Sequence, residues 1–285
     1  YKLYKEYNDD GSIDPFMSTY NVHLKRWSEG NREITFPVTK GNAYKQIDGL
    51  LNWCSVREVG GGNGLGVYQG LVDAFFTKNG LPISDVNSNY NEEGFSNAVD
   101  TRNTKWEYGT GKPGEVTAKH TYNMYCNREP RFYVSVSYNN SYFTQEQRPF
   151  EFFNGGKDNP HTHDAPQNGY LVRKKLSPNS NVKQGNIQYR PGILYRLGEA
   201  YLNYAEALNE SDPGNADILV YLNKIRERAG VRQYTTGSTD NNFIHVNLND
   251  QDAMRKLIHA ERHVELCCEG LRYDDLRRWT EAEKE

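Results

Sequence analysis

The chain has 285 residues, enough for one large domain or two ordinary ones with a sizeable core, and its formal net charge is −3. This charge, without a basic patch, argues against a nucleic acid or an anionic membrane surface as a partner. No apolar run approaches the roughly 18 residues of a membrane span. The sequence begins at Tyr1 without signal-peptide features, so we expect any targeting segment to lie outside these residues.

Aromatic residues make up 13% of the chain, with 21 tyrosines against 3 methionines. A tyrosine ring has an apolar face and a polar tip, so the surplus suits surfaces that contact polar molecules such as sugars. A loop-rich core half filled by tyrosine explains the same composition equally well. The four cysteines form no C-x-x-C pair, and the adjacent Cys267 and Cys268 are expected to pack as small hydrophobic side chains.

The first 30 residues are polar and rich in turn residues. Four of them alternate as the ligands of a calcium loop do: Asn8, Asp10, Ser12 and Asp14. The glycine and the distal glutamate of an EF-hand are missing, so a turn is the preferred interpretation. Residues 33–36 then predict a short strand that ends at Pro37.

Residues 60–66 read GGGNGLG, but they match neither G-x-G-x-x-G nor a Walker loop, so we expect a turn before a helix at 67–78. Residues 131–138 alternate in polarity, which predicts a strand and, with Asn139-Asn140, one arm of a hairpin. Residues 169–174 form a further candidate strand. The segments between these elements are mostly turn residues.

Two amphipathic helices are predicted between Ile193 and Gly230. Apolar residues at helical spacing line the first helix at Leu194, Leu197, Tyr201, Ala205 and Leu208, and the second at Ala216, Leu219, Leu222, Ile225 and Ala229. The Pro-Gly break at 211–214 makes them an antiparallel hairpin, which Gly230 ends. The first helix also follows tetratricopeptide spacing, with Leu194 in place of the usual tryptophan. A lone hairpin of this kind needs neighbours to bury its apolar face.

A last helix is predicted at 252–269, followed by a turn or short helix at 272–279. Two histidines on this helix, His259 and His263, have metal-ligand spacing, but the pattern is not a zincin motif and no third ligand is evident. The loop residues His161, His163 and Asp164 could hold a metal only weakly, and a solvated loop is the preferred interpretation. The sequence therefore predicts no metal site and no cofactor.

Glu261, Glu265 and Glu269 share one face of the last helix. Carboxylates in a row repel unless cations pair with them, and four arginines are near in sequence: Arg262, Arg272, Arg277 and Arg278. We expect a structural ion-pair cluster that ties the helix to the Arg272 turn, rather than acid–base catalysis. The sequence has no G-x-S-x-G elbow and no local Cys-His signature, and nothing selects a catalytic pair among its 37 acidic residues.

Several blocks of the sequence together resemble the SusD/RagB outer-membrane glycan-binding lipoproteins of Bacteroidetes-type bacteria. These blocks keep the order found in that family and lie at 71–76 (LVDAFF), 79–83 (NGLPI), 127–133 (NREPRFY), 195–210 (YRLGEAYLNYAEALNE), 221–230 (YLNKIRERAG), 261–266 (ERHVEL) and 269–279 (EGLRYDDLRRW). Each block alone is a weak signal, and their combination is specific.

The resemblance implies a mainly α, SusD-like fold with tetratricopeptide-like hairpins and a loop-rich region containing short strands. Within this one domain, residues 1–192 would form the loop-rich, ligand-facing part, and residues 193–285 the hairpin and C-terminal helices. It also implies a non-enzymatic protein on the outer surface of the outer membrane. Such a protein captures oligosaccharide or polysaccharide for a SusC-like TonB-dependent transporter, and its lipid anchor would lie outside this chain.

The resemblance suggests the loop between the Ile34 strand and the Leu71 helix as the binding region. Trp53 and Tyr44 could stack on pyranose faces there, and Asn52, Lys45 and Arg57 could donate hydrogen bonds to hydroxyls. Further candidates in polar loop sequence are Trp27, Trp106, Tyr108 and Tyr142. Burial in the core is the alternative for Trp53, and loop packing for the others. The alternative function is a tetratricopeptide-type scaffold for a protein or peptide partner.

Overall fold

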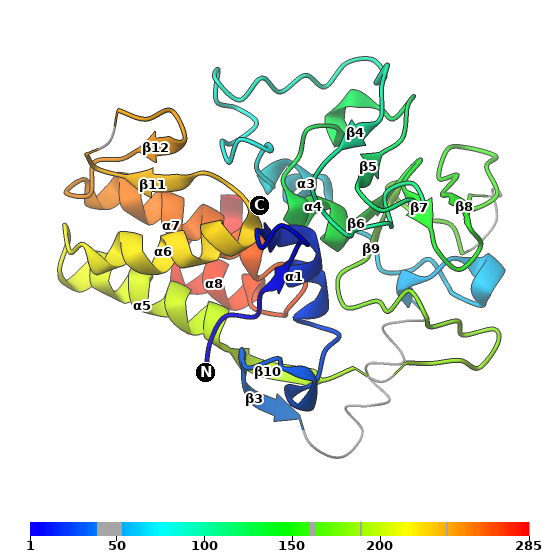
Figure 1. The fold of residues 1–285 in the computed structure, drawn as a ribbon, viewed down its shortest axis with the longest axis horizontal. Coiled ribbons are helices and arrows are strands. Elements are labelled where there is room, and N and C mark those ends of the chain that lie inside the picture. Colours follow the sequence, from blue (N-terminus) through cyan, green and yellow to red (C-terminus); the bar gives the residue numbers. More distant parts are fainter. Residues whose placement is uncertain (39–52, 160–163, 189, 238, 285) are drawn as a thin grey trace.

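The structure is a computed structural model that describes residues 1–38, 53–159, 164–188, 190–237 and 239–284. A helical part, formed by the chain after Arg196, lies beside a loop-rich part formed largely by residues 53–188 (Figure 1). Helix α1 (Pro15–Asn21) lies between the two parts. None of the helices in the described residues is both long and apolar enough to cross a lipid bilayer.

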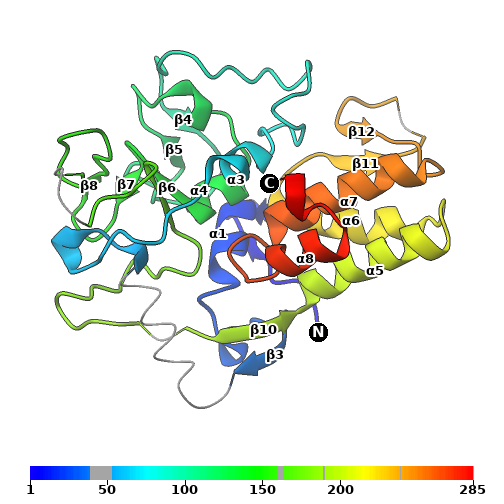
Figure 2. The ribbon, with the colours of Figure 1, turned by 180° about the vertical axis from the view of Figure 1, so that it is seen from behind.

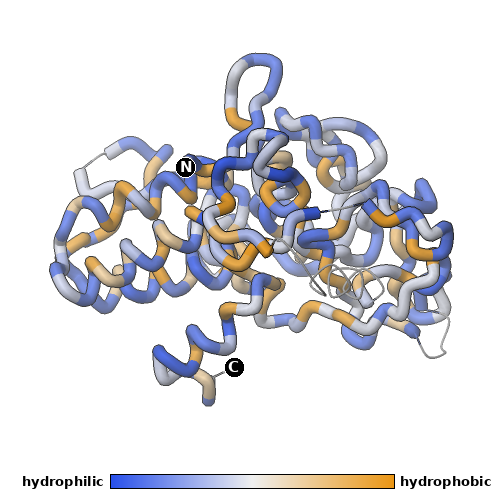
Figure 3. The backbone as a smooth tube through the Cα atoms, turned by 90° about the horizontal axis from the view of Figure 1, so that it is seen from below, coloured by the Kyte–Doolittle hydropathy of each residue, from blue (hydrophilic) through white to orange (hydrophobic). Residues whose placement is uncertain are grey.

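The predicted hairpin is present as α5 (Leu197–Ser211) and α6 (Asp217–Ala229), and α5 also packs against α7 (Gln251–Glu265). The three helices share an aliphatic core that includes Leu202, Ala205, Ile218, Leu222, Met254 and Ile258. Hydrophobic and hydrophilic segments alternate along these helices, as amphipathic packing requires (Figure 3). Gly230 ends α6 in the left-handed conformation, at a φ of 70°.

Two details of the helical prediction are wrong. Leu194 lies in strand β10 (Gly192–Arg196) and is 58% exposed, because the chain is still extended there to pair with β3 (Ile34–Val38). The helix predicted at 252–269 ends at Glu265, since Cys268 and Gly270 take positive φ angles of 59° and 91° in the turn that follows. Helix α8 (Arg272–Arg278) then runs back across α5 and α7 (Figure 2).

The strand predicted at 33–36 is confirmed as β3, but it begins at Ile34 and continues through Pro37, which is paired with Ile193 on a two-stranded sheet. At the N-terminus, β1 (Glu6–Tyr7) and β2 (Ile13–Asp14) form an antiparallel hairpin. After α6, β11 (Gln233–Thr235) and β12 (Phe243–His245) pair in parallel. Short 3-10 turns occupy Trp27–Glu29, Arg57–Val59, Asn123–Tyr125 and Ala282–Lys284.

The strand predicted at 131–138 is wrong over most of its length. Residues Pro130–Ser135 form helix α4, and only Val136–Tyr138 are extended, as β6. Pro130 at the first helical position favours a helix start, and every residue from 130 to 138 is buried, so no face had to be polar. Strand β6 pairs with β9 (Tyr170–Val172), within the strand predicted at 169–174, instead of forming a hairpin at Asn139-Asn140.

The helix predicted at 67–78 is shorter in the structure, as α3 (Gln69–Ala74). Arg128 ends it by donating a hydrogen bond of 2.7 Å to the carbonyl of Phe75. The other strands of this part pair as β4 (Asp100–Thr101) with β5 (Glu115–Thr117), and β7 (Tyr142–Phe143) with β8 (Arg148–Pro149). Its core is dominated by aromatic rings, among them Phe16, Phe75, Trp106, Phe132, Tyr133 and Tyr138.

Candidate functional site

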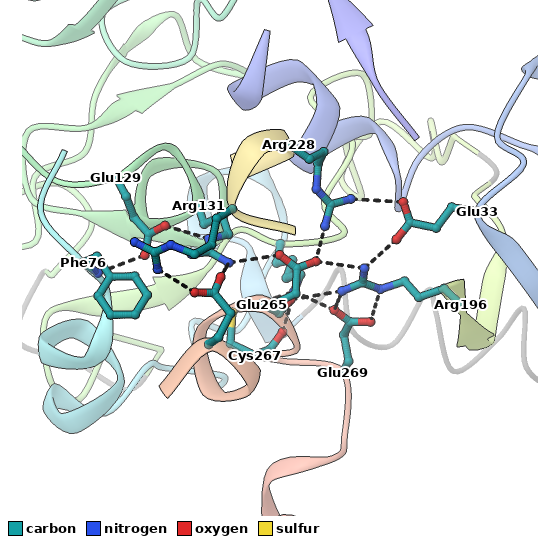
Figure 4. Close-up of polar contacts among 12 residues, drawn as sticks. Glu33, Phe76, Glu129, Arg131, Arg196, Arg228, Glu265, Cys267 and Glu269 are labelled. Atoms are coloured by element: carbon teal, nitrogen blue, oxygen red, sulfur yellow. Dashed lines mark hydrogen bonds and ion pairs between the residues drawn. The ribbon is translucent and has the colours of Figure 1, made fainter. Parts of the chain in front are cut away.

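Glu261 and Glu265 of α7 and Glu269 of the turn after it lie in a buried cluster of charges where the two parts of the molecule meet (Figure 4). We call it the central ion cluster, and it consists of Glu33, Glu129, Glu261, Glu265, Glu269, Arg131, Lys174, Arg196, Arg226 and Arg228. Its five carboxylates face five cations, so the formal charges balance. The cluster joins α4, α6 and α7 to the second residue after strand β9, the residue before β3 and the last residue of β10.

Glu265 pairs with three arginines of the central ion cluster. It pairs with Arg228, lies 2.9 Å from Arg196 Nη1 and lies 3.2 Å from Arg131 Nη1. Burial alone would raise the pKa of Glu265, but the three guanidinium groups hold that pKa well below its usual range. Glu265 is therefore an ionised structural group that is paired with all three of these arginines.

Burial and ion pairing together raise the pKa of Glu129 and lower the pKa of Glu269. Burial raises the pKa of Glu129 despite its 2.7 Å contact with Arg131 Nε. Burial acts in the same direction on Glu269, but Arg196 and Lys174, each 2.7 Å away, hold the pKa of Glu269 well below its usual value. All these side chains are buried and paired with each other, so the cluster is built for structure and not for proton exchange with a ligand.

The expectation of a structural ion-pair cluster on this helix is met, but with different arginines from those expected. The cations on Glu261, Glu265 and Glu269 come from distant segments, not from the arginines near in sequence. Arg262 instead contacts Asp275 at 2.9 Å, and Arg278 pairs with Glu206 and Asp275. This second group ties α7 to α8 and α5, so only this part of the expected link to the Arg272 turn is present.

The described part of the chain contains no group of three or more His, Cys, Asp or Glu side chains placed to hold a metal. His259 stacks on Trp279 with ring centroids 3.5 Å apart, and His263 Nε2 lies 3.1 Å from the hydroxyl of Tyr68. In the N-terminal hairpin, Asp10 accepts hydrogen bonds from Ser12, and Asp14 caps α1 by accepting from the backbone N–H groups of residues 16 and 17. His161 and His163 lie outside the described residues.

The predicted binding region is described from Trp53 onward, and we call residues 53–66 the Trp53 loop. Its two sides are held together by backbone hydrogen bonds, from the Leu65 N–H to the Trp53 carbonyl at 2.9 Å and from the Asn63 N–H to the Ser55 carbonyl at 3.1 Å. Val56 and Val59 anchor the loop in a small core with Phe143, Phe150, Phe152 and Leu171. The loop is therefore an anchored platform.

Trp53 lies on this platform with 57% of its surface exposed, so it is not the core residue that the alternative interpretation expected. Its indole ring lies against Gly64, where an added Cβ would come within 2.5 Å of Trp53 Cε3. The absence of a side chain at Gly64 lets the ring approach the backbone closely. The GGGNGLG segment thus supports the exposed ring of Trp53. Comparing this segment with phosphate-binding loops did not predict that role.

Tyr108 and Tyr142 line a cavity of about 40 Å³ beside the Trp53 loop. Arg173 fixes both residues by donating to the Tyr108 carbonyl at 2.9 Å and to the Tyr142 carbonyl at 3.0 Å. Polar groups on the same cavity come from separate loops and carry no sequence signal: Ser55, Thr144, Gln145 and Ser177. The cavity is far below the roughly 300 Å³ of a small-molecule pocket, so contact with a ligand here would be shallow.

The remaining candidates have different positions. Trp106 is fully buried and packs on Phe16, Tyr20 and Tyr108, so its expected place in a ligand-facing loop is wrong. Trp27 is 43% exposed and packs on Tyr1 and beneath Arg32, whose Cζ lies 4.3 Å from the ring centroid. Arg57 is exposed, with Nη1 3.8 Å from Asp164 Oδ2. Tyr44, Lys45 and Asn52 lie outside the described residues.

Comparison with known proteins decides the family, because the model of the SusD family matches residues 28–285. The chain belongs to the SusD family. SusD-like protein P2 of Formosa agariphila is 29% identical over 172 residues, which are 60% of this chain and 32% of that protein. SusD-like protein P38 of the same organism is 38% identical over 109 residues, which are 38% of this chain and 20% of that protein.

Solved structures show the same fold. The structure of BT4246 has a TM-score of 0.66 and 26% identity, over 95% of this chain and 43% of that one. A SusD-like carbohydrate-binding protein of Bacteroides fragilis, BF0978, has a TM-score of 0.66 and 20% identity, over 97% of this chain and 47% of that one. The predicted mainly α, SusD-like fold is confirmed. This SusD family chain covers less than half the length of each of these four relatives.

Proposed function

We propose that the chain captures a glycan on the cell surface through the exposed ring of Trp53 and does not cleave it. Membership of the SusD family supports the class of ligand. The observation that carries the site is the Trp53 ring, 57% exposed and held against Gly64 on an anchored loop. The C–H groups of a pyranose face pack well on such a ring, because the ring presents a flat apolar surface to them.

Polar groups around Trp53 would set the orientation of the sugar. Arg57 is exposed on the same loop and can donate hydrogen bonds to hydroxyls, and Tyr142 and Gln145 lie on the neighbouring cavity. The cavity is too small for a sugar ring, so these contacts would be made at its mouth. We propose a shallow site that reads one face of the glycan, with no cofactor and no catalytic residue.

The proposal extends to the partners that the family resemblance implies. A SusC-like TonB-dependent transporter would receive the glycan, and a lipid anchor outside this chain would hold the protein at the outer membrane. The loop-rich residues 1–192 would face the ligand, since the Trp53 loop and its cavity belong to them. Residues 193–285 would form the helical support.

Affinity electrophoresis across gels that contain different soluble polysaccharides tests the proposal, with a non-binding protein as the mobility control. We expect retarded migration in one or two gels. Migration equal to the control in every gel would contradict glycan capture. Incubation of the retarding polysaccharide with the protein tests whether the glycan is cleaved. Shorter products on a sizing column would contradict binding without cleavage.

A tetratricopeptide-type scaffold is the second candidate, and the outer face of the α5–α6 hairpin favours it. Tyr204 and Val220 are 43% and 44% exposed there, and Lys224 Nζ lies 4.5 Å from the ring centroid of Tyr221. A protein or peptide partner could use this face. A double substitution of Tyr204 and Val220 to serine should then abolish capture of that partner while leaving gel retardation by polysaccharide unchanged.

A further inference from the structure

A pocket of about 310 Å³ lies between the N-terminal side of α3 and the turn after α7, and it shares no lining residue with the cavity beside the Trp53 loop. Its walls are mostly apolar and include Val67, Leu71 and Val172. Two adjacent cysteines, Cys267 and Cys268, also line it. The volume lies at the lower end of the range for small-molecule sites, roughly 300 to 1,000 Å³. The pocket therefore has room for a small apolar group beside two thiols.

The two thiols are held in an unusual backbone turn. Both cysteines are free, and Cys268 has a positive φ of 59°, a conformation that non-glycine residues rarely adopt. The ammonium group of Lys174 donates to the carbonyls of Glu265 and Cys267 at 2.9 Å each, and its Nζ lies 3.8 Å from Cys267 Sγ. A buried cation thus lies beside one thiol of the pair.

This environment changes the acidity of Cys267. A hydrogen bond from the Cys268 thiol, with the nearby Lys174 ammonium, lowers the pKa of Cys267 although burial alone would raise it. The same hydrogen bond and burial raise the pKa of Cys268. One thiol is thus favoured as the thiolate, and the other stays protonated as its hydrogen-bond donor.

We propose that Cys267 and Cys268 form a reactive dithiol site on the wall of this pocket, which exchanges with small disulfides that carry apolar substituents. In the first step, the Cys267 thiolate attacks one sulfur of a disulfide R–S–S–R, forms a mixed disulfide and releases R–S⁻. In the second, the Cys268 thiol loses its proton to solvent and attacks the Cys267 sulfur. The Cys267–Cys268 bond forms, and a second R–S⁻ leaves. The protein dithiol is oxidised and the small disulfide is reduced to two thiols.

The resulting bond would be easily reversed. Adjacent α-carbons are about 3.8 Å apart, shorter than the roughly 4.4 to 6.8 Å that an unstrained disulfide spans. Strained disulfides have higher reduction potentials and are readily reduced by thiols. Lys174 also contacts Glu269 of the central ion cluster at 2.7 Å, so the turn and that cluster share one cation.

The other two cysteines supply internal controls. Burial raises the pKa of Cys54 to about 12, and it raises the pKa of the half-buried Cys126 as well. The Cys126 thiol donates to the carbonyls of Thr121 and Tyr122, at 3.8 and 3.6 Å. Neither residue has a second thiol beside it. Both should therefore react slowly with a disulfide while the protein is folded.

The test is reaction of the folded chain with one equivalent of 4,4′-dithiodipyridine, followed by absorbance of the released thiopyridone and by mass spectrometry. We expect two thiopyridones per protein and the loss of two hydrogen atoms, mapped to the peptide that contains residues 267 and 268. Cys268→Ser should release one thiopyridone and keep the mixed-disulfide mass. Cys267→Ser should react about tenfold more slowly, since thiolate attack sets the rate.

Cys126→Ser is the matched control and should behave as the unsubstituted chain. The proposal is overturned if Cys267→Ser reacts at the original rate, or if the unsubstituted chain retains a stable mixed disulfide. Far-UV circular dichroism establishes that each variant is folded. Peptide mapping of the unsubstituted product decides the matter if a variant is not folded, because modification at Cys54 or Cys126 instead of the pair would also overturn the proposal.

Discussion

The helical and loop-rich parts of this molecule are stabilised by different kinds of core. The helices α5, α6 and α7 pack aliphatic side chains at regular spacing, such as Leu202, Leu222 and Ile258. The loop-rich part gathers aromatic rings from segments far apart in sequence, with Trp106 and Phe132 fully buried among them. Regular helices present aliphatic side chains to each other at fixed spacing, whereas irregular loops fill the space between them with large rings.

The central ion cluster is one of the contacts between the two parts. Buried ion pairs contribute little net stability compared with a well-packed apolar replacement, but removing one partner is costly, because a charge is left buried without compensation. The cluster therefore fixes which segments meet: Glu265 of α7 must meet Arg131 of α4, Arg196 of β10 and Arg228 of α6. We infer that its main contribution is to specify the arrangement.

The largest effect is expected for Glu265→Ala. The substitution leaves Arg131, Arg196 and Arg228 buried with one carboxylate fewer, and we expect the free energy of unfolding to fall by about 3 to 5 kcal/mol. Urea unfolding followed by circular dichroism measures it. Glu227→Ala is the matched control, because Glu227 pairs with Lys5 on the surface, and it should change stability by less than about 1 kcal/mol. Equal effects of the two substitutions would contradict the role given to the cluster.

Trp106→Ala tests the aromatic core of the loop-rich part. It removes a fully buried ring that packs on Phe16, Tyr20 and Tyr108, and a loss of about 3 to 4 kcal/mol is expected. Trp27→Ala removes a ring that is 43% exposed and should cost much less. A Trp106→Ala protein with unchanged stability and lowered glycan affinity would instead identify Trp106 as a ligand contact. That result would contradict its role in the aromatic core.

Acid should weaken the junction between the two parts. The pKa values of Glu265 and Glu269 are lowered in the folded protein, so both carboxylates bind fewer protons there than in the unfolded chain. Their stabilisation is fully present above the unfolded pKa of about 4.5 and is lost as pH falls below it. The raised pKa of Glu129 acts in the opposite direction and offsets part of this loss. The melting temperature should therefore fall from about pH 5 to pH 3.5, and a constant value would count against the cluster.

The sequence predicted the parts of the fold that depend on local periodicity. The spacing from Leu197 to Ala229 specified the hairpin, because each helix presents its apolar face at fixed intervals. The strand prediction at 131–138 was wrong because both faces of that segment are buried. Alternation in polarity then does not indicate which face is exposed to solvent. The boundaries of α3 and α7 depend on Arg128 and on the Cys268 turn, which are tertiary contacts and backbone details.

The candidate site was predictable only in part. Trp53 was found through the resemblance, and the structure places it on the surface. Trp106 stands in equally polar sequence but is buried, because two of the rings that cover it come from residues about 90 positions earlier. The partners of Glu265 are likewise 37 to 134 residues away, so arginines near in sequence gave the wrong pairs. The sequence near Trp106 and Glu265 therefore does not indicate which residues they contact in the folded protein.

Isothermal titration calorimetry of Trp53→Ala with the polysaccharide that retards the protein tests the central claim most directly. Trp27→Ala serves as the matched control, since Trp27 is also an exposed tryptophan but packs on Tyr1 and Arg32. We expect Trp53→Ala to weaken glycan binding about tenfold, equivalent to roughly 1.4 kcal/mol, at an unchanged unfolding free energy. Trp27→Ala should leave the affinity unchanged. Equal affinity of Trp53→Ala and the unsubstituted chain would contradict the assignment of the glycan site to the Trp53 loop.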